Sequence, residues 1–149
     1  MSLHLVLRLI HVLAAIVAVG ANLTYAFWLR RAGTDGDRIA FTIAAIQRLD
    51  RTFANPGYLV LLLSGLAMTA TGGFGFERGW IIAGLALYLL AALLGFTLFA
   101  PAIRRQLAEA ERDPTSAAYA AAARRSQLLA GVTTALVLAI VALMVLKPF

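Results

Sequence analysis

The stretch that decides the fold is residues 9–29, LIHVLAAIVAVGANLTYAFWL, which contains no charged residue. Crossing the hydrocarbon core of a bilayer takes roughly 20 apolar residues in a helix. Three more uncharged runs of that length or longer follow, at residues 52–76, 79–103 and 126–146. Because the backbone of a lipid-exposed segment must satisfy its own hydrogen bonds, these runs predict four transmembrane helices.

The composition agrees with a lipid environment. Of the 149 residues, 62% are hydrophobic and 13% are charged, whereas about 25% are charged in ordinary globular domains. A soluble domain of this size has too little interior to hide so much apolar surface. We therefore expect residues 1–149 to form a single all-α integral membrane domain.

The charged residues and the missing motifs exclude several classes of function. The net charge is +6, but the arginines lie in short clusters between apolar runs and form no continuous basic face for nucleic acid. The absence of cysteine excludes thiolate catalysis and cysteine-held zinc or iron–sulfur clusters. No nucleotide-binding glycine loop, nucleophile elbow or HExxH motif is present. The sequence therefore favours a protein that is not an enzyme.

The basic residues predict the orientation of the chain. The links after the first and third apolar runs hold Arg30, Arg31, Arg38, Arg48, Arg51, Arg104, Arg105, Arg112, Arg124 and Arg125. The other side has Arg8, Arg78 and Lys147. The positive-inside rule then places both arginine-rich links in the cytoplasm and both termini on the outer, periplasmic side of a bacterial inner membrane. Short links make sequential helices antiparallel neighbours, which predicts an up-down four-helix bundle.

The first arginine-rich link is itself predicted to be helical. Thr34-Asp35-Gly36-Asp37 offers turn residues and a helix N-cap. From there Ile39, Ile43, Ile46, Leu49 and Phe53 recur at spacings of three and four. This stripe predicts an amphipathic cytoplasmic helix that lies along the interface or projects as an overhang of the second span. Asn55-Pro56-Gly57 and Ala100-Pro101 should break or kink the second and third spans, and Thr115 or Ser116 should cap the fourth helix.

Polar side chains at membrane depth are the candidates for function, because their burial in lipid is costly. His11 lies inside the first span, and Arg8 stands one turn nearer its outer end. His4 lies on nearly the same helix face, at the interface, where we expect it to be solvated. We expect Asn22 and Tyr25 to form hydrogen bonds to other helices, with Asn55, Thr97, Ser126 or Gln127 as partners. All seven acidic residues fall in links, which disfavours a carboxylate proton relay.

Two methionines belong with His11 by depth. Met68 lies near the end of the second span and Met144 near the end of the fourth, so both fall in the outer third of the membrane. Histidine with thioether sulfur is a ligand set for copper(I), and a histidine–methionine pair also ligates haem iron. The alternative for both methionines is ordinary packing in an apolar core.

Several short motifs resemble one family over nearly the whole chain. Leu9-Ile10-His11-Val12-Leu13-Ala14-Ala15-Ile16, Asn55-Pro56-Gly57, Trp80 and Pro101 with its trailing arginines are similar to small bacterial membrane proteins of domain-of-unknown-function family 2269. The first helix is more distantly similar to copper resistance protein D and to the bacterial membrane-bound protoporphyrinogen oxidase. Those relatives usually have tryptophan where this chain has Ala18. The resemblance implies a functional role for His11 alone.

Three hypotheses for function follow. The first is an inner-membrane protein that binds a small ligand, with haem or copper as the candidates, or that serves as an accessory subunit. The second is a redox enzyme or redox component that holds haem on His11. The third is a small transporter that acts as an oligomer. In each case the partner is the lipid bilayer, with a homo-oligomer or a larger membrane complex as the expected assembly.

The predicted orientation can be tested with single cysteines, because the natural chain has none. Cysteines at Asp35 and Glu109 should resist a membrane-impermeant thiol reagent in intact cells, whereas a cysteine at Gly75 should react. Labelling after lysis serves as the control for accessibility. Labelling at Asp35 and Glu109 in intact cells would overturn the orientation.

Overall fold

The computed structural model describes residues 2–72 and 75–148, and within them every long element is a helix. Four helices are long and apolar enough to cross a membrane, as the sequence predicts. The first is α1 (Leu3–Ala32) and the last is α6 (Ala117–Leu146). The second consists of α2 (Gly36–Leu49), the π-helical turn η1 (Asp50–Ala54) and α3 (Asn55–Thr71), and the third of α4 (Gly79–Leu94), the π-helical turn η2 (Gly95–Phe99) and α5 (Ala100–Arg112).

Polar caps begin α2 and α6 where the sequence predicts them. The Asp35 carboxylate accepts a hydrogen bond from the backbone N–H of Arg38 at 3.1 Å. The Ser116 hydroxyl oxygen accepts one from the backbone N–H of Tyr119 at 3.1 Å, so Ser116 rather than Thr115 is the cap. Each cap satisfies a backbone donor that the first helical turn leaves without a partner.

Both prolines of the long helices follow a π-helical turn. The backbone N–H of Asn55 bonds to the carbonyl of Asp50, and that of Ala100 bonds to the carbonyl of Gly95. Pro56 and Pro101 lack an N–H, and their rings crowd the carbonyl four residues earlier. A wider turn just before each proline relieves this conflict, so both helices continue through the expected break.

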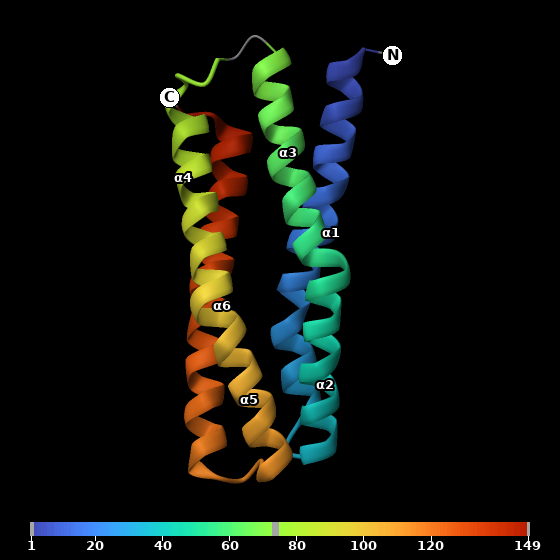
Figure 1. Ribbon diagram of the computed structural model, residues 1–149, viewed down its shortest axis with the longest axis vertical. Coiled ribbons are helices and arrows are strands. Elements are labelled where there is room, and N and C mark those ends of the chain that lie inside the picture. Colours follow the sequence, from blue (N-terminus) through green and yellow to red (C-terminus); the bar gives the residue numbers. More distant parts are fainter. Residues whose placement is uncertain (1, 73–74, 149) are drawn as a thin grey trace.

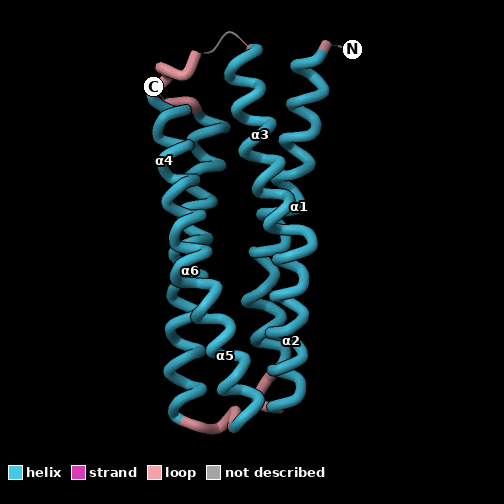
Figure 2. The backbone as a smooth tube through the Cα atoms, viewed as in Figure 1, coloured by secondary structure: helices cyan, strands magenta, loops and turns pink. Residues whose placement is uncertain are grey.

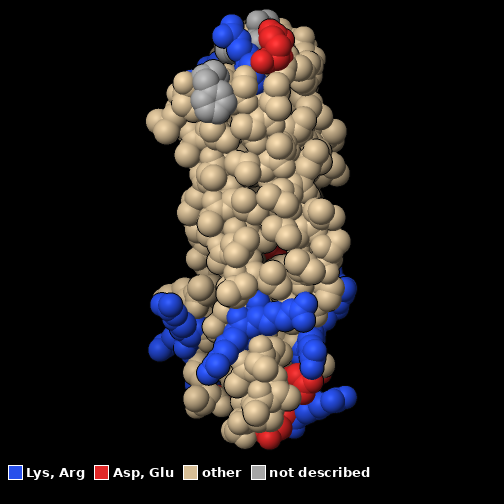
Figure 3. All heavy atoms as spheres, turned by 90° about the vertical axis from the view of Figure 1, so that its left-hand side faces the viewer, with Lys and Arg blue, Asp and Glu red and all other residues tan. Residues whose placement is uncertain are grey.

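The helices form two pairs that lie side by side (Figure 1). One pair is α1 with the α2–α3 helix, and the other is the α4–α5 helix with α6. Both chain termini lie at one end, here called the terminal end, and links 33–35 and 113–116 lie at the other, here called the basic end. Figure 3 shows arginine side chains gathered in a belt near the basic end, below a broad band without charged side chains. Many large hydrophobic residues are exposed in this band, here called the apolar band.

The two pairs join at the basic end, through contacts of α2 with α5 and of α1 with α6. A core of buried side chains fills this junction: Ala32, Ile39, Ile43, Ile103 and Ala110. The predicted amphipathic helix is therefore an overhang that packs against other helices, and it does not lie along the interface. The predicted stripe is right at Ile39, Ile43 and Ile46, which are buried, but wrong at Leu49 and Phe53, which are exposed.

Toward the terminal end the pairs separate (Figures 1 and 2). Among the described residues α3 makes no close backbone contact with α4, although a short link connects them. The expectation that all sequential helices are neighbours is therefore wrong for this pair along the membrane part. Large side chains such as Leu63, Ile82 and Leu138 are half exposed there, which suits a lipid environment.

The junction at the basic end gives a stability prediction. Ile43 is fully buried, whereas Phe41 two residues earlier is 76% exposed. Replacing Ile43 with alanine removes buried methyl groups and leaves a cavity, so Ile43→Ala should cost about 2–5 kcal/mol. Phe41→Ala is the matched control and should change stability by less than about 0.5 kcal/mol. Denaturation of both variants in detergent, followed by circular dichroism, checks this, and equal losses would contradict the packing described here.

Candidate ligand site in the cleft between the helix pairs

The separation of the two pairs leaves a cleft with two adjoining cavities. The larger, here called the large cavity, has a volume of about 790 Å³ and extends from His11 toward Arg104. The smaller, here called the small cavity, has a volume of about 240 Å³ and lies at the terminal end. His11, Leu61, Tyr88, Ile140 and Met144 line both cavities. These side chains therefore form the boundary between the two compartments.

The small cavity brings the predicted site residues together. Arg8 and His11 line it from α1, Met68 from α3 and Met144 from α6. The lining of this cavity thus comes from three helices, which belong to both pairs. No group of three or more histidine, cysteine or acidic residues that could hold a metal ion occurs among the described residues. A metal in this cavity would therefore depend on thioether sulfur as well as imidazole nitrogen.

His11 is held in place by the second helix. Its Nδ1 lies 2.9 Å from the Ser64 hydroxyl oxygen. The same hydroxyl lies within donating distance of the Val60 and Leu61 backbone carbonyls, and when it donates to one of them the N–H of the His11–Ser64 pair belongs to Nδ1. The neutral ring then carries its lone pair on Nε2. Gly65 makes room for the ring, because a Cβ there would lie 3.2 Å from His11 Cε1.

Arg8 stands at the rim of the small cavity and interacts with His4 rather than with His11. The Arg8 guanidinium donates to His4 Nε2 at 3.3 Å. His4 is partly buried and lines the small cavity, so it is less exposed to solvent than expected. Gly72 lies close to the His4 ring, which a Cβ at that position would contact at 2.8 Å. The rim therefore carries a fixed positive charge beside two imidazoles.

The two methionines differ in their surroundings. The terminal methyl of Met144 occupies the space that Gly84 leaves on α4, so this side chain packs two helices together. Met68 is partly buried on α3 and lines the small cavity without lining the large one. Met144 thus has an evident packing role, and Met68 is the more available sulfur.

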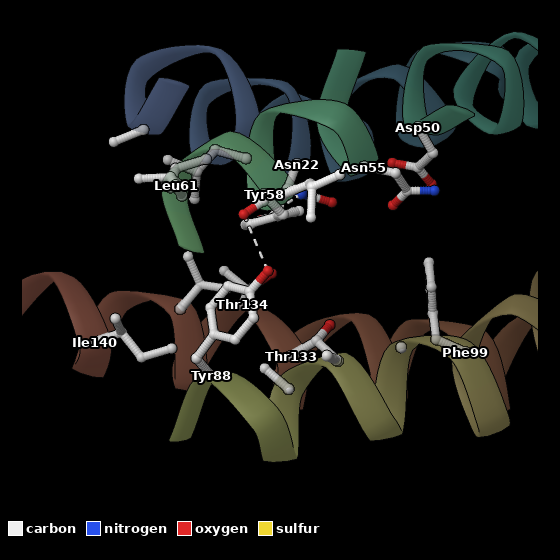
Figure 4. Close-up of a pocket in the computed structure, with 18 of the residues that line it drawn as sticks. Asn22, Asp50, Asn55, Tyr58, Leu61, Tyr88, Phe99, Thr133, Thr134 and Ile140 are labelled. Carbon is white, nitrogen blue, oxygen red and sulfur yellow. Dashed lines mark hydrogen bonds between the residues drawn. The ribbon is translucent and has the colours of Figure 1, made fainter. Parts of the chain in front are cut away.

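The large cavity contains polar residues that sequence reasoning missed (Figure 4). The Tyr25 hydroxyl donates to Asp50 Oδ1 at 2.7 Å, and the Asn22 amide donates to the Tyr58 hydroxyl at 2.7 Å. The partners expected for Asn22 and Tyr25 were therefore wrong. Asp50 also lies within a membrane-length helix rather than in a link. It continues the buried stripe four residues after Ile46, and that spacing could have identified it.

At mid-height a hydrogen bond crosses the cleft. The Tyr88 hydroxyl on α4 donates to the backbone carbonyl of Tyr58 on α3 at 3.0 Å, drawn as a dashed line in Figure 4. Thr133 and Thr134 on α6 also line this part of the large cavity. The hydroxyl groups of the two tyrosines thus make the cleft polar at mid-height, although apolar side chains surround them. The cleft is also polar at the basic end.

Comparison with known proteins places the chain in a family. The family described as predicted integral membrane protein (DUF2269) matches residues 5–148, and the chain belongs to it. No curated protein and no solved structure matches the chain. The comparisons do not show the expected likeness of the first helix to copper resistance protein D and to the protoporphyrinogen oxidase.

Proposed function

We propose that this member of the DUF2269 family binds a small ligand in the cleft through His11, and that the small cavity selects a soft metal ion, copper(I). The observation that carries the proposal is that His11, Met68 and Met144 line one cavity from three helices. Imidazole and thioether groups are ligands that copper(I) accepts and that hard cations avoid. The small cavity suits an ion better than an organic molecule, because organic ligands usually occupy about 300–1,000 Å³.

The hydrogen bond between His11 and Ser64 supports a ligand role. Histidines that bind metals commonly donate their other ring N–H to an oxygen, which fixes the tautomer and the orientation of the ring. In this chain Nδ1 makes that bond, and Nε2 is left as the nitrogen that can bind a metal.

Haem is the second candidate, because the large cavity reaches a size typical of cofactor sites. His11 and Met144 line both cavities and form a histidine–methionine pair of the kind that holds haem iron. Arg8 at the rim would supply positive charge for a propionate. Bound haem would supply redox or ligand-binding chemistry, and the residues of this chain would hold and orient it.

The setting of this function is also proposed. By the positive-inside rule, the belt of arginines supports an orientation with the basic end in the cytoplasm and the small cavity toward the outer side of a bacterial inner membrane. A ligand there would reach the protein from the periplasm or from the outer leaflet. The open side of the cleft suits either a second copy of the chain or a helix of a larger complex. A second copy would fit the role of an oligomeric transporter, and a helix of another protein would fit the role of an accessory subunit.

Metal binding by purified variants tests the proposal. The parent protein in detergent should bind copper(I) under reducing conditions, measured by metal analysis and by competition with a chromogenic chelator. His11→Gln should abolish binding. Ser64→Ala should weaken it by about 10–100-fold, because the ring loses its orienting partner. Met68→Leu should also weaken copper(I) binding. Lys147→Gln is the control: Lys147 lies at the edge of the cavity and supplies no donor for copper, so this change should leave the affinity unaltered.

The same preparations separate copper from haem. A Soret absorption band in the parent that disappears in His11→Gln would assign haem instead, because copper(I) has no such band. Circular dichroism of each variant verifies that the helices are intact. A parent protein that takes up neither copper(I) nor haem, or a His11→Gln variant that binds as tightly as the parent, would refute a ligand role for His11.

A further inference from the structure

The large cavity ends among charged and polar side chains at the arginine belt. Gln47, Asp50, Arg51 and Asn55 line it from the second helix, and Arg104 lines it from α5. The two arginines thus belong to different helix pairs and flank the same opening. Figure 3 shows the belt that arginines form at this level, directly below the apolar band.

These groups have hydrogen-bonding capacity that the chain does not use. Gln47 Nε2 is buried and has no hydrogen-bond partner among the described residues. Neither Arg51 nor Arg104 forms an ion pair within the described part of the chain. Asp50, by contrast, accepts the Tyr25 hydroxyl through Oδ1 and so is tied to α1. The opening therefore presents two guanidinium groups as donors, and an unpartnered amide N–H₂ lies buried beside them.

Between the arginine belt and the mid-height tyrosines, the large cavity is lined on one side by apolar residues of the third membrane-length helix. These are Ala92, Phe96 and Phe99. Because the two helix pairs separate above the basic end, a hydrocarbon chain can enter the cavity sideways from the bilayer. Donors at one end and an apolar channel beyond them are the two halves of an amphipathic site.

We propose that the basic-end opening of the cleft binds an anionic phospholipid. Its phosphate lies between Arg51 and Arg104, the Gln47 amide donates to a phosphate or ester oxygen, and one acyl chain occupies the large cavity. Basic pockets between transmembrane helices are typical sites for anionic headgroups, and guanidinium groups bind phosphate with paired, charge-assisted hydrogen bonds. The lipid would bridge the two helix pairs where their own packing ends. The headgroup end of this site does not include His11 and does not depend on the proposed copper(I).

Two further features of the opening bear on the headgroup. Asp50 lines the same cavity, and its negative charge disfavours a phosphate placed deep in the cleft. The headgroup therefore belongs at the arginines, on the solvent side of Asp50. The exposed side chains of Arg51 and Arg104 can reach it there without leaving water.

Lipid binding to the full chain tests the proposal. The purified protein in a neutral detergent is titrated with phosphatidylglycerol or phosphatidylcholine, and bound lipid is measured by native mass spectrometry. Phosphatidylglycerol should bind more tightly. The double variant Arg51→Gln/Arg104→Gln should lose affinity by about fivefold for each arginine. The matched control Arg48→Gln/Arg105→Gln removes two exposed arginines of the same belt that do not line the cavity, and it should retain at least half of the affinity.

The amide gives a second variant that keeps the net charge. Gln47→Leu should weaken phosphatidylglycerol binding about tenfold, as expected for the loss of a hydrogen bond to a charged group, even if the double arginine variant fails to fold. Equal losses in the control variant would mean diffuse charge attraction and would overturn the proposal. So would equal binding of the two lipids, or displacement of phosphatidylglycerol by millimolar inorganic phosphate, which would indicate a free-anion site without a role for the acyl chain.

Discussion

The packing of α2 against α5 at the basic end is the interaction on which the rest of the structure depends. In lipid, apolar side chains gain little by burial against one another, since the surrounding acyl chains are equally apolar. The hydrophobic effect acts where water is present, and the largest fully buried side chains, Ile43 and Gln106, lie at the basic end. The buried pair Gln106 and Ser126, which share a hydrogen bond, lies in the same region. The two helix pairs are joined there and are free to separate elsewhere.

The cleft follows from this arrangement, and so do both proposed sites. Within each pair, polar contacts such as His11 with Ser64 and Tyr25 with Asp50 fix the helices. Between the pairs, the Tyr88 hydroxyl crosses the cleft to α3. Side chains that face the cleft are thus held by hydrogen bonds within their own helix pair, and few contacts connect them to the other pair. A site of this kind can accept a metal or a lipid without disturbing the helices that carry it.

Sequence alone could predict the helices and the depth of one candidate site residue, His11. The spans, the caps at Asp35 and Ser116 and the depth of His11 follow from charge-free runs and turn residues, which are local properties. On helix α1, residues at intervals of seven share one face: His4, His11, Ala18, Tyr25 and Ala32. Of these, Ala18, Tyr25 and Ala32 are buried. This stripe shows that the face of His11 is the face that packs on the second helix.

The rest could not be predicted, because it depends on partners distant in sequence. The spacing after Ile46 points to Asp50, but its partner Tyr25 lies on another helix and could not be predicted from that spacing. The π-helical turns keep the helices continuous across Pro56 and Pro101, where local chemistry alone predicts a break or kink. The separation of α3 from α4 opposes the tendency of linked helices to be neighbours. It depends on which part of the bundle lies in the membrane and which part lies in water.

The most direct test of a bundle joined at its basic end and open in the membrane is a pair of distance distributions in lipid nanodiscs. Spin labels at Leu63 on α3 and Ile82 on α4 report on the open part, and labels at Phe41 on α2 and Glu111 on α5 report on the junction. Double electron–electron resonance should give a narrow distribution at the junction and a broader one in the membrane. Tyr88→Phe should broaden the membrane distribution alone. Two equally narrow distributions, both unchanged by Tyr88→Phe, would show that the pairs pack together along their whole length and would contradict the account.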